Sequence, residues 1–301
     1  FRGEIFLVPT DPETGEKTRV TTSPWRDRYA EFSPDGTLLA YVSDESLEEE
    51  LWVHSLEDGS KRKLSSHESQ KTRNFVWSPD GSRITYVAAN RLFEVDVASG
   101  RSTELGYNIA RGYTLSQYSA DGDWLLYDRR DAEQDQDVYL FDIAAREEHD
   151  VTANPFRDSQ GTLTPTGEHL VFLSARDGGT SHLFITHLAT LTGDPSDPLV
   201  KARKAEQDQE AEPGPLQVDT DGIERRAVQL TTGENGVGTY FLSADGGTIY
   251  FTSRDDDGPG LFSIGIDGEG QKKVSDGTFD GIRRTRNGEA AFFIQNGQGA
   301  G

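Results

Sequence analysis

The chain has 301 residues, of which 34% are hydrophobic, and a formal net charge of −22 at pH 7. Such an acidic surface repels a phosphate backbone, so we expect no nucleic-acid partner. No apolar run approaches the ~20 residues that a membrane-spanning helix needs, which predicts no membrane partner. With no Cys in the chain, a disulfide, a thiolate nucleophile and a Cys-based zinc site are excluded.

One short turn recurs along the chain and separates two extended runs each time. Its clearest copy is Ser33-Pro34-Asp35-Gly36, with Phe32 before it and the apolar run 38–43 after it. Pro presets φ for a turn and Gly accepts a positive φ, so the pattern predicts a β-hairpin. Further copies follow Trp77, Tyr118, Leu163 and Leu242, and the last copy is Asn287-Gly288.

The spacing of these turns predicts the architecture. The turn glycines are 45, 41, 45, 79 and 42 residues apart. A period of roughly 40–45 residues with four short strands is typical of a propeller blade. The longest gap equals one period plus an insertion. We therefore expect an all-β fold, a β-propeller of four-stranded antiparallel blades.

The predicted elements begin with a half unit, whose strands are residues 3–8 and 18–22. The first full unit spans about 28–64, with strands at 29–32, 38–43, 51–55 and 61–64. The second, third and fifth full units span about 72–105, 112–151 and 238–274. The fourth begins near residue 157 and is interrupted by a polar insertion at about 190–217, after which 218–230 supplies its last strand. A half unit starting at residue 279 ends the chain.

Five full units and two halves favour six blades, with the N-terminal and C-terminal halves completing one sheet between them. Such closure removes exposed sheet edges. Seven blades, two of them incomplete, are the alternative. We expect one propeller domain over residues 1–301. Phe1 follows no initiator Met, which predicts a truncated or processed start.

No catalytic signature is visible in the sequence. It contains no Gly-x-Ser-x-Gly elbow, His-Glu-x-x-His zinc helix, phosphate loop or Gly-x-Gly-x-x-Gly motif. The six histidines are scattered, and the acidic runs 131–137 and 255–257 lack the spacing of a calcium loop. We therefore predict no catalytic residue, no metal site and no cofactor in this chain.

Arginines recur near the start of the predicted innermost strand of each unit. In a propeller this strand lines the central channel, so these side chains could form a basic collar that attracts carboxylate-bearing peptides. The alternative is that each Arg pairs with an acid on the neighbouring blade. The residues are Arg28, Arg73, Arg111, Arg157 and Arg283.

The repeats also resemble known families. Residues 32–45 and 77–81 resemble the repeats shared by TolB-type and peptidase-associated propellers. The opening 2–9, the segment 148–152 and the segment 218–230 after the insertion resemble the second propeller of tricorn-type serine peptidases. This similarity covers essentially the whole chain, although that propeller has seven blades in the family.

The tricorn resemblance implies a cytoplasmic, homo-oligomeric serine peptidase that trims oligopeptides, with this propeller as a channel or filter. The family's catalytic residues belong to later domains, so none is assigned here. These later domains and oligopeptides are the expected partners. Two alternatives stay open: a TolB-like protein-binding scaffold in the periplasm, and the gating propeller of a prolyl-oligopeptidase-like enzyme.

Overall fold

The computed structural model describes residues 3–9, 15–22, 24–67, 71–110, 112–133, 135–176, 178–190, 215–285 and 290–296. Within these residues the chain forms strands β1 to β24 and one short 3₁₀ helix, η1 (Ile223–Arg226). Five of the sheets have four strands in simple sequence order, and two have two strands. No helix in the described residues is both long and apolar enough to span a bilayer.

The chain packs into two compact units, which are larger than the repeats predicted from the sequence. From here on, the first unit and the second unit mean these two. The first contains Phe1–Tyr118 and Arg129–Gln134, and the second contains Ser119–Asp128 and Asp135–Gly301. The expectation of a single domain stays a prediction.

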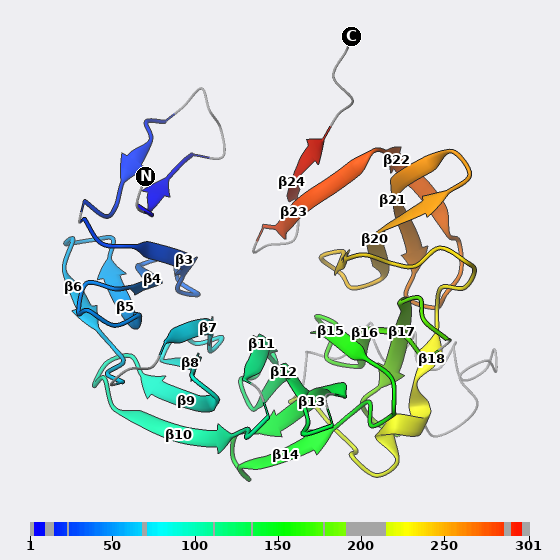
Figure 1. The fold of residues 1–301 in the computed structure, drawn as a ribbon, viewed down its shortest axis with the longest axis horizontal. Helices are drawn as coiled ribbons and strands as arrows, with labels where there is room; N and C mark the ends of the chain where they lie inside the picture. Colours follow the sequence, from blue (N-terminus) through cyan, green and yellow to red (C-terminus); the bar gives the residue numbers. More distant parts are fainter. Residues whose placement is uncertain are drawn as a thin grey trace. The chain divides into compact units, whose positions relative to one another are not determined.

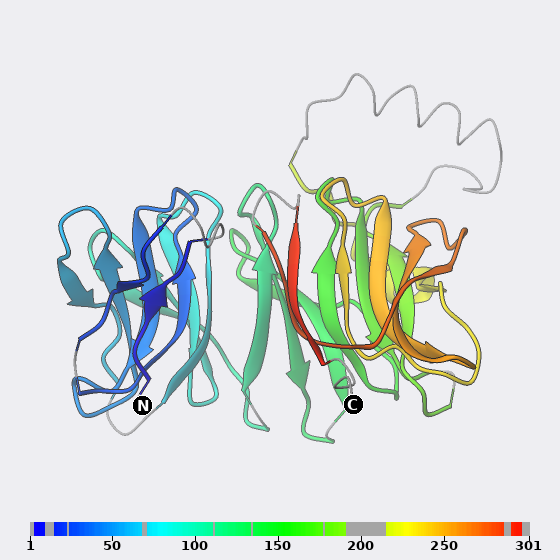
Figure 2. The same cartoon turned by 90° about the horizontal axis from the view of Figure 1, so that it is seen from above.

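The first unit holds one two-stranded sheet and two four-stranded sheets (Figure 1). The two-stranded sheet pairs β1 (Phe6–Leu7) with β2 (Thr18–Arg19). The others are β3 (Asp27–Phe32), β4 (Leu38–Ser43), β5 (Glu50–Ser55) and β6 (Lys61–Lys63), then β7 (Thr72–Trp77), β8 (Arg83–Ala88), β9 (Arg91–Asp96) and β10 (Ser102–Tyr107). Strand β11 (Tyr113–Tyr118) also belongs to this unit. Figure 2 shows the strands of each sheet running side by side.

The second unit continues the same pattern. Most of β12 (Trp124–Arg130) lies in it, followed by β13 (Gln136–Asp142) and β14 (Glu147–Asp150). Two complete sheets follow: β15 (Asp158–Leu163), β16 (His169–Ser174), β17 (His182–His187) and β18 (Val228–Gln229), then β19 (Tyr240–Leu242), β20 (Thr248–Asp255), β21 (Gly258–Gly265) and β22 (Lys272–Asp276). The last sheet pairs β23 (Thr278–Arg284) with β24 (Ala291–Asn296).

The five full repeats and two half repeats predicted from the sequence are therefore confirmed, since the described residues form five four-stranded sheets and two two-stranded sheets. Strands β1–β2 and β23–β24 each form a two-stranded sheet of their own, so six or seven blades stays a prediction. The predicted insertion lies mostly outside the described residues, but Asp219 N donates to Leu188 O at 2.9 Å, so the chain resumes beside the point where it left. The predicted strand lengths 3–8 and 18–22 were wrong, because the amide of Ile5 bonds to the hydroxyl of Thr21 instead of a backbone carbonyl.

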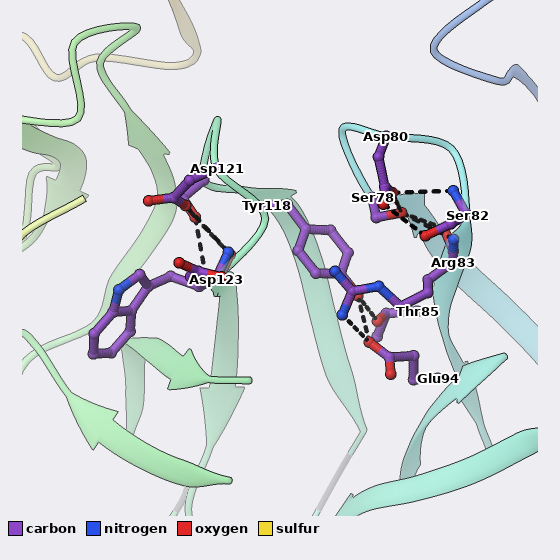
Figure 3. Close-up of polar contacts among 11 residues, drawn as sticks. Ser78, Asp80, Ser82, Arg83, Thr85, Glu94, Tyr118, Asp121 and Asp123 are labelled. Atoms are coloured by element: carbon purple, nitrogen blue, oxygen red, sulfur yellow. Dashed lines mark hydrogen bonds and ion pairs between the residues drawn. The ribbon is translucent and has the colours of Figure 1, made fainter. Parts of the chain in front are cut away.

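The repeated turn is held by its first residue as well as by Pro and Gly. In the copy of Figure 3, Ser78 Oγ donates to Asp80 Oδ1 at 2.6 Å and accepts from the Arg83 amide at 2.9 Å. The Asp80 carboxylate also accepts from the Ser82 amide at 3.0 Å. The same amide-to-hydroxyl bond joins Leu38 to Ser33, Trp124 to Ser119, His169 to Thr164, Thr248 to Ser243 and Ala290 to Thr285. The hydroxyl thus links the two strands of each hairpin.

These hydrogen bonds predict an acid-sensitive fold. The bond from Ser78, followed by those from Ser82, lowers the pKa of Asp80 to about 2. A carboxylate whose pKa is depressed in the folded state stabilises the protein above its unfolded-state pKa. Its contribution should therefore be lost as the pH falls from about 4 to about 2.

We expect Asp80→Asn to flatten this acid-dependent loss of unfolding free energy, measured by urea denaturation at a series of pH values. Asp221→Asn, in an exposed turn, is the control. Identical acid limbs for the wild type and Asp80→Asn would contradict the linkage.

A second hydroxyl bond recurs after the last strand of a sheet. Thr21, Ser65, Thr152 and Thr231 accept from the backbone amides of Ile5, Leu51, Val138 and Leu183, at 2.8–3.0 Å. In each copy the hydroxyl takes the place of the next backbone carbonyl, so the last strand ends there. Both hydroxyl motifs belong to the repeat and therefore have a structural role.

Each unit has its own apolar core. In the first unit, Ile84, Tyr86 and Val42 are fully buried within one cluster. In the second, one cluster surrounds Leu140 and Phe172, and another surrounds Ile249 and Phe251. Strands such as β4, β8 and β16 are buried along most of their length, as is typical of strands with sheet neighbours on both sides.

Candidate peptide-binding site on the first strands

The first strand of several sheets carries a register shift near its start. In β3 the shift lies between Arg28 and Glu31, and in β15 between Ser159 and Thr162. The extra residue has a left-handed backbone: φ is 57° at Tyr29 and 57° at Gln160. The shift is a β-bulge, which changes the direction of the neighbouring side chains.

Arg28 and Arg73 occupy corresponding positions in the first unit. Arg28 follows Asp27, which pairs with the last residue of β4, and Arg73 follows Thr72, which pairs with the last residue of β8. The structure therefore places these two predicted site residues at the same point of successive sheets.

Glu49 connects the two strand starts. Its carboxylate forms an ion pair with the Arg28 guanidinium, and its backbone carbonyl accepts from the Thr72 amide at 2.8 Å. Arg28 therefore pairs with an acid of its own repeat, and not with one of the neighbouring blade as the alternative expected, whereas Arg73 is exposed. An ion pair still leaves guanidinium donors for a carboxylate ligand, since the group carries five N–H bonds.

Tyr29 adds an aromatic surface beside Arg28. The Tyr29 side chain is 59% exposed, and the Arg28 guanidinium lies 5.3 Å from the centroid of its ring. A left-handed conformation costs a residue other than Gly about 1–2 kcal/mol, and such strain is often found at ligand sites.

Gln160, at the corresponding bulge of the second unit, has a clear structural reason for its conformation. Its amide donates to Asp128 Oδ2 at 2.9 Å, and its carbonyl accepts from the Tyr240 hydroxyl. Tyr29 instead presents its ring to solvent.

The other predicted arginines lie elsewhere in the repeat. Arg157 is exposed and precedes Asp158, the counterpart of Asp27, so it lies two positions before the register position of Arg28. Burial raises the pKa of Asp128 to about 6, and the positive charge of Arg157 opposes this effect. Arg283 follows the bulge residue Gly281, and its side chain is outside the described residues, as is the whole of Arg111. The five-residue collar as a set stays a prediction.

Sequence reasoning missed a buried polar cluster in the second unit. Asp158 is fully buried and lies 2.7 Å from Arg176 Nη2, and its carboxylate also accepts from the Asn154 side-chain amide. Burial, followed by the charge of Asp150, raises the pKa of nearby Asp137 to about 7. A signal existed in the sequence, because two repeats share an Asp at the start of the first strand and a Ser at the end of the second strand. These residues pair as Asp27 with Ser43 and as Asp158 with Ser174.

Figure 3 shows a second network, which ties β11 to the preceding sheet of the first unit. The Tyr118 hydroxyl donates to Glu94 Oε2 at 3.2 Å and bonds to the Thr85 hydroxyl, and Arg83 Nη1 lies 3.1 Å from the same Glu94 oxygen. Burial raises the pKa of Tyr118. Since these groups satisfy one another, the network is structural.

The described residues form repeated four-stranded antiparallel sheets, and hairpins join the strands within each sheet. No helical layer lies between these sheets in that part of the chain. This architecture is that of a β-propeller. The family model for the TolB β-propeller domain, PD40, matches residues 3–190. This chain belongs to that family.

The chain is similar in sequence to one protein named as a peptidase, and in structure to several solved propellers. A segment of 143 residues is 29% identical to the uncharacterized peptidase YuxL of Bacillus subtilis (strain 168), covering 46% of this chain and 20% of YuxL. The tricorn protease structure has a TM-score of 0.72 at 14% identity, over 98% of this chain and 30% of that chain. TolB from Acinetobacter baumannii has a TM-score of 0.56 at 16% identity, over 91% of this chain and 59% of that chain.

The chain thus spans less than two thirds of the length of each of these three proteins. The structural likenesses concern the fold. The relation to YuxL and the tricorn fold make this a propeller related to those of peptidases and of TolB.

Proposed function

We propose that this chain is a non-catalytic propeller domain of a tricorn-like serine peptidase, in which it binds oligopeptides and admits them to catalytic domains of the same protein. The observation that carries the proposal is the surface of Arg28, Tyr29 and Arg73 at the starts of neighbouring first strands. In a propeller these strands line the central channel, and arginine beside an aromatic ring suits a peptide carboxylate. The relation to peptidase propellers supports the same assignment.

The proposal includes a cytoplasmic, homo-oligomeric parent protein. A second candidate is a TolB-like scaffold that binds a folded protein in the periplasm, which the family match favours. A scaffold of this kind would bind a folded partner and show no preference among short peptides.

The test is binding of a fluorescein-labelled acidic hexapeptide at low ionic strength, followed by fluorescence anisotropy. The double variant Arg28→Gln/Arg73→Gln should bind about three- to tenfold more weakly, the range expected for two partly exposed charge contacts. Tyr29→Gly should also bind more weakly without losing stability, because Gly adopts the left-handed backbone freely. Arg225→Gln is the matched control, since the Arg225 side chain is 85% exposed on η1.

Unchanged affinity in both first-strand variants would reject the site. Equal binding of acidic, neutral and basic peptides would reject carboxylate recognition. Peptide hydrolysis by this chain above background, retained after repurification, would reject the assignment of catalysis to other domains.

A further inference from the structure

The second unit contains a polar pocket away from the first-strand arginines. Its volume is about 260 Å³, and it lies between the segment that follows β18 and strands β20 and β21. Three acidic residues, Glu234, Asp255 and Asp256, line it, together with one basic residue, Arg254, and the aromatic residues Phe251 and Phe262. An acidic rim with an aromatic side is suited to an organic cation.

An ammonium group of the chain itself already uses two of these residues. Lys273 Nζ lies 2.8 Å from Asp255 Oδ1 and 2.7 Å from Asp276 Oδ1, and 5.7 Å from the ring centroid of Phe262. The hydrogen bond to Asp255, followed by that to Asp276, raises the pKa of Lys273, and the bond from Lys273 lowers the pKa of Asp255. Both partners are therefore charged at neutral pH.

The same arrangement recurs in the first unit. A pocket of about 200 Å³ is lined by Tyr41, Glu45 and Lys61 among others. Lys61 forms an ion pair with Glu45, and its Nζ lies 5.6 Å from the ring centroid of Trp52.

Strand register shows that the two pockets correspond. Tyr41 pairs with Trp52 across β4 and β5, as Phe251 pairs with Phe262 across β20 and β21. In each case the two threonines that follow the last strand of the preceding sheet also line the pocket: Thr21 and Thr22, and Thr231 and Thr232. The aromatic pair and the two threonines thus belong to the repeat. The lysines differ in position, because Lys61 pairs with His54 whereas Lys273 pairs with Phe262.

The two pockets differ in how many acids they leave beyond the lysine's partners. In the first unit Glu45 pairs with Lys61, and Asp27 is the one other acid that lines the pocket. In the second unit Lys273 bonds to Asp255 and Asp276, while Glu234 and Asp256 also line the pocket and are exposed. Ion pairs of this exposure are weak, so a ligand cation can compete with the lysine.

We propose that the pocket of the second unit binds an alkylammonium group, as presented by the lysine side chain of a basic peptide, and that Lys273 is a built-in competitor for it. The net charge of −22 would concentrate such cations near the surface. This site is independent of the proposed carboxylate recognition at the first strands.

The experiment is an NMR titration of ¹⁵N-labelled protein with Nα-acetyl-lysine methylamide. Nα-acetyl-norleucine methylamide, which lacks the charge, is the ligand control. Lys273→Met should tighten binding of the lysine derivative about fivefold, the upper range for loss of a partly exposed ion pair. Lys272→Met, at the neighbouring exposed position of β22, should leave the affinity unchanged. Asp256→Asn should weaken binding without affecting the Lys273 ion pairs.

Equal affinities for the wild type, Lys273→Met and Lys272→Met would overturn the proposal, and so would binding of the norleucine derivative as tight as that of the lysine derivative. Absence of resonance shifts around Asp255 and Phe262 in every variant would also overturn it. Cadaverine is tested in parallel: if it binds competitively and more tightly than the lysine derivative, the site takes a free diamine, and the reverse order supports a peptide. Thermal unfolding of each variant verifies that the fold is intact.

Discussion

Replacing Arg176 by Met should lower the free energy of unfolding by about 3–5 kcal/mol, because it leaves the buried carboxylate of Asp158 without its cation. Asp158 is fully buried, and Arg176 Nη2 lies 2.7 Å from Asp158 Oδ2. Arg176 also stacks on Phe184, with its guanidinium 4.9 Å from the ring centroid. The measurement is urea denaturation followed by tryptophan fluorescence.

The loss should depend on pH. Burial raises the pKa of Asp158, although the positive charge of Arg176 opposes this effect. Without Arg176 the pKa should rise further, so the folded state binds a proton more tightly than the unfolded state does. Stability then increases as the pH falls through the folded-state pKa, and the deficit of Arg176→Met should be smaller at acidic pH than at alkaline pH.

Two controls separate the charge from other effects. Arg225→Met removes an exposed arginine of the same unit and should change stability by less than about 0.5 kcal/mol. The double variant Asp158→Asn/Arg176→Met should recover part of the loss, since a neutral group is less costly to bury than an unpaired charge. A small, pH-independent deficit in the single variant, with no recovery in the double, would contradict this account.

Leu140→Ala should destabilise the second unit by about 2–5 kcal/mol, the usual cost of truncating a fully buried Leu. Leu140 on β13 has no exposed surface and packs in the cluster that contains Phe172. Part of the cost is lost burial of apolar surface, and the rest is the cavity left in the core. Differential scanning calorimetry and urea denaturation both measure it.

Val228→Ala is the matched control on β18, because Val228 is 56% exposed. It should change stability by less than about 0.5 kcal/mol. Similar losses for the two variants would show that burial in this cluster does not determine stability.

The fold was largely predictable because its main signal is local and repeated. Five of the six copies of the turn combine Pro or Ala with Gly between two β-prone runs, and the repeat period gives the number of strands per repeat. The role of the turn hydroxyls was missed, because Ser78 and its counterparts were considered only as general turn residues. Their bonds to an amide five residues later become apparent only once the hairpin register is known.

The candidate site was predictable only in part. Arg28 and Arg73 correspond because their repeats match residue for residue, whereas Arg157 lies two positions away in the register. Arg28 and Arg73 lie eight residues before their turn glycines, and Arg157 lies ten before Gly167. A bulge leaves no mark in composition or spacing, so the left-handed backbone of Tyr29 was not predictable. The Asp158–Arg176 pair joins residues on different strands, and no local pattern connects them.

The fourth strands described above also affect behaviour at high protein concentration. Strand β6 has three residues, Lys61, Arg62 and Lys63, all exposed, and β18 has two. A long, flat, uncharged edge would offer its free amides and carbonyls to a strand from another molecule. In these two sheets the edge is too short to template one, and in β6 it is also positively charged, so the sheets that end in β6 and β18 should resist amyloid-like assembly.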